Sequence, residues 1–341
     1  MILPLLVLAL ALSNPVAGVQ HDARFTDGRA FNYLVVIVLE NHGLGDILGS
    51  ASAPYMNQLA STYGVALNYT AVNHPSLPNY LALLSGQEFY SWSAGDCGPS
   101  PSCNAGAAPN IVDSLEARGL SWKAYMENYP SNCGSQCSSG GCFLGDNGLY
   151  AARHDPFVYF GDIVNSTARC DRIVPANSTD SSSLDGGLLA DLASPSTSSN
   201  LMWLTPNLCN DMHDCSVSTG DTYLSEIVPK ILESNLFTHQ KAALFITFDE
   251  GNTVYPSDYV YSVWAGRNIK TSFVSTTPYS HFSFLSTIEQ AWHLRPLTSN
   301  DSSAIPMNAF FQTSHHHGHD NDQGSRDNHE KGHDKNGKDL D

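Results

Sequence analysis

Three stretches of the chain are almost wholly apolar, and polar residues follow each of them. The stretches are residues 34–39, 201–204 and 242–248. Continuous apolar runs with β-branched side chains are typical of strands covered on both faces, as in a parallel central sheet. The polar residues just beyond the ends of these runs are Glu40, Asn207, Asp249 and Glu250. We therefore expect a parallel sheet with polar side chains along its carboxyl edge.

Helix candidates lie between and around these strands, at residues 55–63, 76–84, 108–118, 222–233 and 282–294. Alternation of strand and helix is typical of an α/β fold with a doubly wound, mostly parallel central sheet and helices on both faces. Residues 19–312 suffice for one such domain, because 42% of the chain is apolar and can form a large core. Ligands bind beyond the carboxyl ends of the strands in this fold, so we expect the functional site there.

Two segments depart from the alternation. Residues from about 86 to 148 contain five of the eight cysteines among many Gly, Ser, Pro and Asn residues, which predicts a disulfide-tied excursion. Residues 313–341 are nearly all His, Asp, Asn, Gly and Lys, a composition that cannot bury a core. We expect this tail to be disordered, with metal scavenging by its histidines as the alternative.

Several features point to a secreted protein. Residues 1–18 are almost wholly apolar and end in small residues, which predicts a signal peptide; the run is too short for a stable membrane anchor, since a spanning helix takes about 20 residues. The eight cysteines form an even set, as in an oxidised extracellular protein. Glycosylation sequons occur at Asn68, Asn165, Asn177 and Asn300.

The net charge of −17 argues against nucleic acid or an anionic membrane surface as a standing partner. An anionic substrate would then need a local positive centre, which a bound metal ion can supply. Ser76 opens an apolar helix candidate, and the N-terminus of a helix offers free N–H groups and a positive dipole end to a phosphate. Ser76 could equally be no more than a helix cap.

The acidic residues at the strand ends favour the functional interpretation. Carboxylates gathered at one edge repel each other unless a cation or shared proton neutralises them, and divalent metals accept carboxylate and imidazole ligands together. A metal beside Ser76 would lower the pKa of its hydroxyl. The candidate ligands are Glu40, Asn41, Asp249, Glu250, His213 and His281. Taken alone, each of these residues could instead be a helix cap or part of a surface turn. Asp211 and His213 lie between Cys209 and Cys215, so a structural loop closed by a disulfide is an alternative explanation for them.

Several of these segments together resemble a known family of phosphoesterases, which contains acid phosphatases and phospholipases C. The matching motifs lie at residues 40–42, 74–80, 205–214, 248–251 and 279–281, within a region of about 33–294. The family is similar in fold to the alkaline phosphatases, so the resemblance implies an alkaline phosphatase-like sheet.

The resemblance also implies roles for individual residues. Ser76 would be the nucleophile that becomes phosphorylated, and Asn79 would donate a hydrogen bond to a phosphoryl oxygen. Glu40, Asn41, Asp249 and Glu250 would form the main metal site. A second metal, present in some relatives, would be held by His213 and His281 with Asp211. His154 would protonate the leaving oxygen or bind phosphate, and a buried structural histidine is the alternative there.

We therefore expect a secreted, metal-dependent phosphomonoesterase of the acid phosphatase type, which acts on a phosphate ester through a phosphoserine. The alternatives are a phosphodiesterase of the phospholipase C type and a secreted metal- or glycan-binding protein without activity. A Ser-His-Asp hydrolase is disfavoured because the GxSxG elbow is missing. Mixed oxygen and nitrogen ligands favour zinc and suit manganese or iron, whereas calcium or magnesium would suit oxygen ligands alone. The number of metals and the oligomeric state stay open.

Overall fold

The protein is described here by a computed structural model that covers residues 30–176, 185–252 and 257–312. The expected signal peptide, the His/Asp-rich tail at 313–341 and the sequon at Asn177 lie outside the described residues. Within these ranges, no helix has the length and apolar character needed to cross a membrane.

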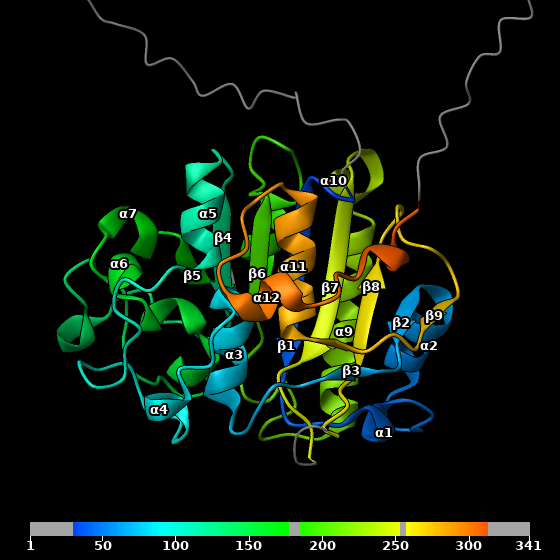
Figure 1. Ribbon diagram of the computed structural model, residues 1–341, viewed down its shortest axis with the longest axis horizontal. Helices are drawn as coiled ribbons and strands as arrows, with labels where there is room; N and C mark the ends of the chain where they lie inside the picture. Colours follow the sequence, from blue (N-terminus) through cyan, green and yellow to red (C-terminus); the bar gives the residue numbers. More distant parts are fainter. Residues whose placement is uncertain (1–29, 177–184, 253–256, 313–341) are drawn as a thin grey trace, which may run out of the picture.

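An eight-stranded sheet forms the centre of the molecule (Figure 1), with the strand order β5-β4-β6-β1-β7-β8-β2-β9. The strands are β1 (Tyr33–Leu39), β2 (Gly64–Ala66), β4 (Trp122–Met126), β5 (Ile173–Pro175), β6 (Leu201–Thr205), β7 (Ala242–Phe248), β8 (Ser262–Ala265) and β9 (Phe273–Ser275). β1 lies between β6 and β7 and is parallel to both, while β8 is antiparallel to its two neighbours. The predicted parallel centre, built from the three apolar runs, is confirmed.

Helices cover both faces of this sheet, as predicted. On one face α3 (Ser76–Ser85) packs against α11 (His281–Ala291), which in turn contacts α12 (Ser299–Ser303). On the other face α9 (Val217–Leu232) packs against α2 (Pro54–Thr62). The remaining α-helices are α1 (Leu44–Ile47), α4 (Tyr90–Ser93), α5 (Ile111–Ala117), α6 (Gly161–Val164), α7 (Thr167–Cys170), α8 (Gly186–Asp191) and α10 (Asn235–His239).

Short elements complete the chain. A two-stranded parallel sheet pairs β3 (Tyr69–Thr70) with β10 (Tyr279–Ser280). The 3₁₀ turns are η1 (Gly134–Gln136), η2 (Ala152–His154), η3 (Pro156–Tyr159) and η4 (Asn308–Phe310).

The cysteine-rich region is not one continuous excursion. Between residues 86 and 148 the chain forms α5 and then β4, and β4 is a full member of the central sheet beside β6. Disulfides tie the loops on either side, with Cys97–Cys103 before α5, and with Cys133–Cys137 and Cys142–Cys170 after β4. The fourth disulfide, Cys209–Cys215, follows β6, so all eight cysteines are bonded as expected.

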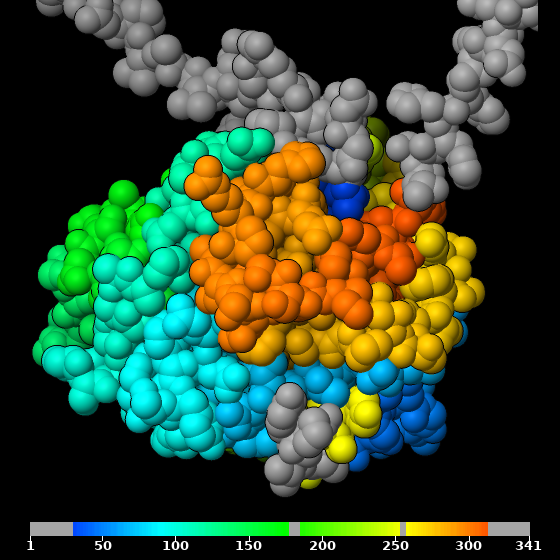
Figure 2. All heavy atoms as spheres, in the orientation of Figure 1, coloured from blue at the N-terminus to red at the C-terminus, as the bar shows by residue number. Residues whose placement is uncertain are grey.

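The carboxyl ends of β1, β6 and β7 meet at the lower edge of the sheet in Figure 1, because the three strands are parallel neighbours. The loops beyond this edge bring distant segments together. Thr70 is bridged to Tyr259, and His74 lies 3.1 Å from Asp258, so the segments before α3 and after β7 lie side by side at the surface (Figure 2).

Candidate active site

Glu40 and Ser76 meet at the carboxyl edge of the sheet. Glu40 directly follows β1 and is fully buried, and the next residue, Asn41, takes a left-handed conformation that asparagine tolerates well. α3 begins at Ser76 after an extended Pro75. The Ser76 hydroxyl donates a hydrogen bond to Glu40 Oε2 at 3.0 Å. A serine hydroxyl is thus held at the N-terminus of a ten-residue helix, against a buried carboxylate.

Asp249 and Glu250 follow β7 and lie next to this pair. The backbone N–H of Asn41 donates to Asp249 Oδ1 at 3.3 Å, which joins the ends of β1 and β7. Asp249 Oδ2 is buried and has no hydrogen-bond partner among the described residues. Glu250 Oε2 lies 2.9 Å from His74 Nδ1 and accepts a hydrogen bond from Asn79 at 3.3 Å. The structure therefore brings four of the expected residues together: Glu40, Asn41, Asp249 and Glu250.

His154 and Asp211 lie on the other side of Glu40. His154 Nε2 is 3.4 Å from Glu40 Oε1, and its Nδ1 is 3.3 Å from Asp211 Oδ2. All three side chains are buried, and each offers an atom within 4.8 Å of the other two. Asp211 Oδ2 and His154 Nε2 have no hydrogen-bond partner among the described residues.

These unpartnered atoms fit a cation. Buried carboxylate oxygens and an imidazole nitrogen are costly without partners, and a divalent metal would satisfy several of them at once. The chemistry of the set, mixed oxygen and nitrogen, is that of zinc, manganese or iron sites. The structure thus contains a buried group that could bind a metal and makes His154 a further candidate ligand, beside the proton-transfer or phosphate-binding role expected for it.

Burial raises the pKa values of the carboxyl groups in this cluster, and for Glu40, Asp211 and Glu250 the charge of a neighbouring carboxylate adds to the rise. Burial, with the charges of Asp249 and Asp211, raises the pKa of Glu40 well above its usual range. Burial raises the pKa of Asp249 to about 7 and that of Asp211 to about 8. Burial together with Asp249 raises the pKa of Glu250 to about 10. Without a cation this cluster therefore holds protons near neutral pH, and a cation would displace them.

His281 has both ring nitrogens engaged inside the protein. Its Nε2 donates to the backbone carbonyl of Asp249, and its Nδ1 accepts from the Tyr69 hydroxyl at 3.1 Å. Burial lowers the pKa of His281 to about 4, so the ring is neutral. This arrangement differs from the expected metal-ligand role, because no lone pair faces the carboxylates. His281 instead fixes the Asp249 peptide.

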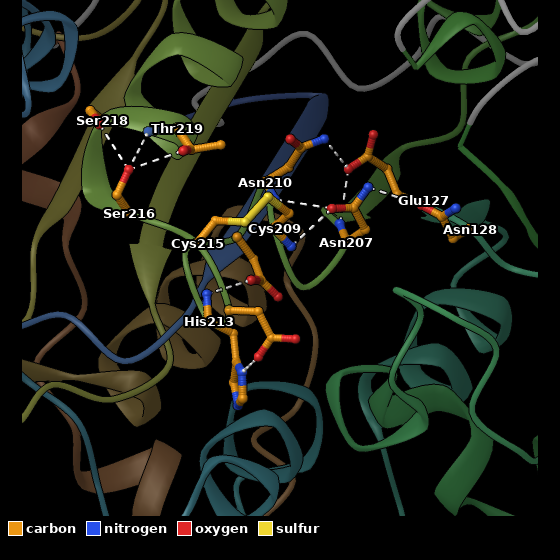
Figure 3. The surroundings of a disulfide bond; sticks show 12 residues. Glu127, Asn128, Asn207, Cys209, Asn210, His213, Cys215, Ser216, Ser218 and Thr219 are labelled. Carbon is orange, nitrogen blue, oxygen red and sulfur yellow. Dashed lines mark hydrogen bonds and ion pairs between the residues drawn. A yellow bond between two sulfur atoms is a disulfide. The ribbon is translucent and has the colours of Figure 1, made fainter.

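His213 also lies outside the buried cluster. Its Nδ1 is 2.7 Å from Asp214 Oδ1 and its Nε2 is 3.2 Å from Arg153 Nη2. Figure 3 shows His213 on the loop closed by Cys209–Cys215. The His213 ring lies 5.4 Å from the His154 ring. Its two nitrogens face Asp214 and Arg153, whereas a metal ligand was expected at this position.

Asn79 is fully buried and is used to shape the loop before Ser76. Its side-chain oxygen accepts from the N–H groups of Val72 and Asn73, and its amide donates to the carbonyls of Asn73 and Pro75. This geometry differs from the expected contact with a phosphoryl oxygen. Asn79 holds the backbone that presents Ser76.

Sequence reasoning missed two neighbours of the cluster. The Tyr80 hydroxyl donates to Glu40 Oε1, and the Tyr80 ring stacks on His154. The carboxylate of Asp96 accepts a hydrogen bond from the N–H of Leu77, in the first turn of α3, at 2.9 Å. Tyr80 lies one helical turn after Ser76, a spacing that could have placed it on the same helix face; no sequence signal identifies Asp96.

Comparisons with known proteins identify the family of this chain. The model of the Phosphoesterase family matches residues 46–295. A probable acid phosphatase of Kluyveromyces lactis is 30% identical over 301 residues, which cover 86% of this chain and 65% of the relative, just under two thirds of its length. A phosphatidylinositol-3-phosphatase of Mycobacterium tuberculosis is 29% identical over 277 residues, covering 81% and 82%.

The fold has relatives among solved structures. A protein of the alkaline phosphatase superfamily from Vibrio parahaemolyticus superposes with a TM-score of 0.53 at 12% identity, covering 81% of this chain and 70% of that one. This likeness supports the alkaline phosphatase-like sheet. With the family model matching most of the chain, the protein belongs to the phosphoesterase family.

Proposed function

We propose that the protein is a secreted, metal-dependent phosphomonoesterase of the acid phosphatase type that acts through a phosphoserine at Ser76. The observation that carries the proposal is the placement of Ser76 Oγ, 3.0 Å from Glu40 within a cluster of buried carboxyl groups that have unpartnered oxygens. The acid phosphatase name of the yeast relative supports the reaction class. Paired cysteines support secretion, since disulfides persist in oxidising compartments.

The metal would be held by Glu40, Asp211, Asp249 and His154. Two further polar side chains would lie next to it, those of Asn41 and Glu250. A bound divalent cation would supply Lewis-acid stabilisation of the Ser76 alkoxide and of the negative charge on the phosphoryl group. Tyr80 and His281 would keep Glu40 and the Asp249 peptide in position through their hydrogen bonds.

The reaction has two displacements at phosphorus. Ser76 Oγ attacks the phosphorus atom and gives its proton to Glu40 while the bond to the alcohol oxygen breaks; the departing oxygen takes a proton from water and leaves as the alcohol. Water then attacks the phosphoserine, the bond from phosphorus to Oγ breaks, and Oγ recovers a proton as phosphate departs. Splitting one difficult step into two is the usual advantage of covalent catalysis.

The test is phosphate release from p-nitrophenyl phosphate. Wild type should turn over, and chelation or Ser76→Ala should abolish turnover, with metal restoring only the chelated wild type. Ser61→Ala, an exposed serine of α2, is the matched control and should behave as wild type. Wild-type turnover by the Ser76→Ala variant would contradict the phosphoserine mechanism. Full metal binding with no turnover on any phosphoester would favour the non-enzymatic alternative.

A second candidate function is cleavage of a lipid phosphoester, including the phospholipase C reaction. A pocket of about 360 Å³ is lined by Gly43 and Asn252, on the loops that follow β1 and β7, and its rim includes Leu67 and Tyr259, which are 37% and 42% exposed. Exposed apolar side chains beside a polar site suit an apolar leaving group. The name of the mycobacterial relative also refers to a lipid phosphate. Leu67→Ser should slow hydrolysis of vesicle lipid but not of p-nitrophenyl phosphate if this candidate is right.

A further inference from the structure

The proposed site is strongly acidic, and one arginine stands beside it. Nη2 of Arg153 lies 3.2 Å from Nε2 of His213, on the loop between Cys209 and Cys215 that also carries Asp211. Arg153 is half-buried on η2, directly before His154. A dianionic substrate approaching Ser76 meets several carboxyl groups, so a fixed positive charge at this place has an electrostatic use.

The contacts of His213 orient the guanidinium. Arginine can only donate hydrogen bonds, so His213 must accept at Nε2 and carry its proton on Nδ1, facing Asp214 Oδ1 at 2.7 Å. Asp214, His213 and Arg153 therefore form a directed chain. The Cys209–Cys215 disulfide closes the loop that carries the first two members (Figure 3).

Two routes of contact connect this chain to the nucleophile. On one side, the ring of His213 lies 5.4 Å from that of His154, which adjoins Glu40, the acceptor of the Ser76 hydrogen bond. On the other side, Asp96 accepts the N–H of Leu77, the residue after Ser76. Burial raises the pKa of Asp96, and the charge of Arg153 opposes part of this rise, so the guanidinium lies near the carboxylate that accepts the Leu77 N–H.

We propose that Arg153 binds the non-bridging phosphoryl oxygens of the substrate and of the phosphoserine, and that His213 is its positioning residue. A guanidinium has five N–H donors in a planar fork that matches two phosphate oxygens, and His213 accepts one of them. The inference rests on the proposed function and deepens it: Arg153 would hold the face of the phosphoryl group that points away from the metal ligands.

The first experiment measures inorganic phosphate binding to the metal-loaded protein by calorimetry. Arg153→Met should weaken binding by about 10- to 100-fold, the loss expected for one charge-assisted contact, and Arg153→Lys should fall between this variant and wild type. Arg118→Met, an exposed arginine at the end of α5, is the matched control and should bind as wild type. Circular dichroism and the melting temperature verify that each variant is folded.

The outcomes separate this inference from the proposed function. If wild type binds phosphate through Arg153 but hydrolyses no phosphoester, the proposed function fails and the binding role stands. If wild type hydrolyses p-nitrophenyl phosphate and Arg153→Met leaves KM, kcat and phosphate affinity unchanged, the role of Arg153 is overturned while the enzyme stands. Absence of phosphate binding in wild type also overturns it.

The positioning role of His213 has its own readout. His213→Gln keeps an oxygen that can accept from Arg153, so phosphate affinity should stay within a few-fold of wild type, whereas His213→Ala should approach Arg153→Met. Metal content should be unchanged in both variants. Loss of metal together with unchanged phosphate affinity would instead make His213 a metal ligand and contradict the inference.

Discussion

The rings of Tyr80 and His154 stack almost in parallel, with centroids 5.5 Å apart and an angle of 9° between the planes. The Tyr80 hydroxyl also donates to Glu40, which adjoins His154. One aromatic side chain of α3 therefore fixes two groups of the buried cluster at once. α3 therefore provides both Ser76 and, one helical turn later, the tyrosine that holds Glu40 and His154 in place.

Tyr80→Phe tests this support. The variant keeps the stacked ring but leaves Glu40 Oε1 without its hydroxyl donor, so we expect the free energy of unfolding to fall by about 1–2 kcal/mol. We expect kcat for p-nitrophenyl phosphate to fall by about tenfold, as for loss of one hydrogen bond that orders a catalytic group. Chemical denaturation and steady-state kinetics measure the two effects. An unchanged kcat would show that Glu40 needs no such support.

Removal of metal should destabilise the protein. A ligand that binds only the native state adds about 4 kcal/mol at a thousandfold excess over its Kd, so chelation should lower the melting temperature and metal should restore it. Asp249→Asn and Asp211→Asn should both reduce the metal content measured by mass spectrometry. Asp171→Asn, exposed at the end of α7, is the control. Equal metal content in all four proteins would place the cation elsewhere.

Asp221 on α9 should contribute to stability through the start of α2. Its buried carboxylate accepts the backbone N–H groups of Tyr55 at 3.1 Å and Met56 at 2.8 Å, which a helix leaves unpaired in its first turn. Asp221→Ala should lower the free energy of unfolding by about 2 kcal/mol. Glu226→Ala, on the exposed side of the same helix, should change it little. Urea denaturation distinguishes the two.

Glu289 on α11 should make stability depend on pH. Burial and the charge of Asp301 raise its pKa from 4.5 to about 9. Between these values the folded protein holds a proton that the unfolded chain releases, so the contribution of this group is complete below pH 4.5 and is lost as the pH rises toward 9. The glutamine of Glu289→Gln carries no charge at any pH in this window and can still accept a hydrogen bond from the Leu297 N–H, so the stability of the variant should fall less steeply. Parallel slopes for variant and wild type would contradict this.

The sequence predicted the elements that depend on local pattern. The apolar runs at β1, β6 and β7 and the start of α3 follow from composition and helix-end chemistry, so the carboxyl edge and Ser76 could be found without a structure. β4 was missed because its five residues lie within a region dominated by cysteine, glycine and serine. Its neighbour in the sheet, β6, lies far along the chain.

The partners of individual side chains could not be predicted in the same way. The sequence identifies His213 and His281 as residues able to ligate metal, but the partner of each ring nitrogen is set by tertiary contacts with Arg153, Asp214 and Tyr69. His154 faces Glu40 and Asp211 for the same reason. Motif spacing can identify a histidine as a candidate ligand, but it cannot tell which group each of its ring nitrogens faces.

The central place of β1 has a consequence for how the chain folds during synthesis. β1 is made before β6 and β7, yet Leu34 pairs with Leu201 on one side and with Ala243 on the other. The edges of this apolar strand therefore stay unpaired until β6 and β7 have also emerged from the ribosome. Long-range pairing of this kind slows folding and exposes edges that aggregate. We expect β1 to be the segment that needs chaperone protection during biosynthesis.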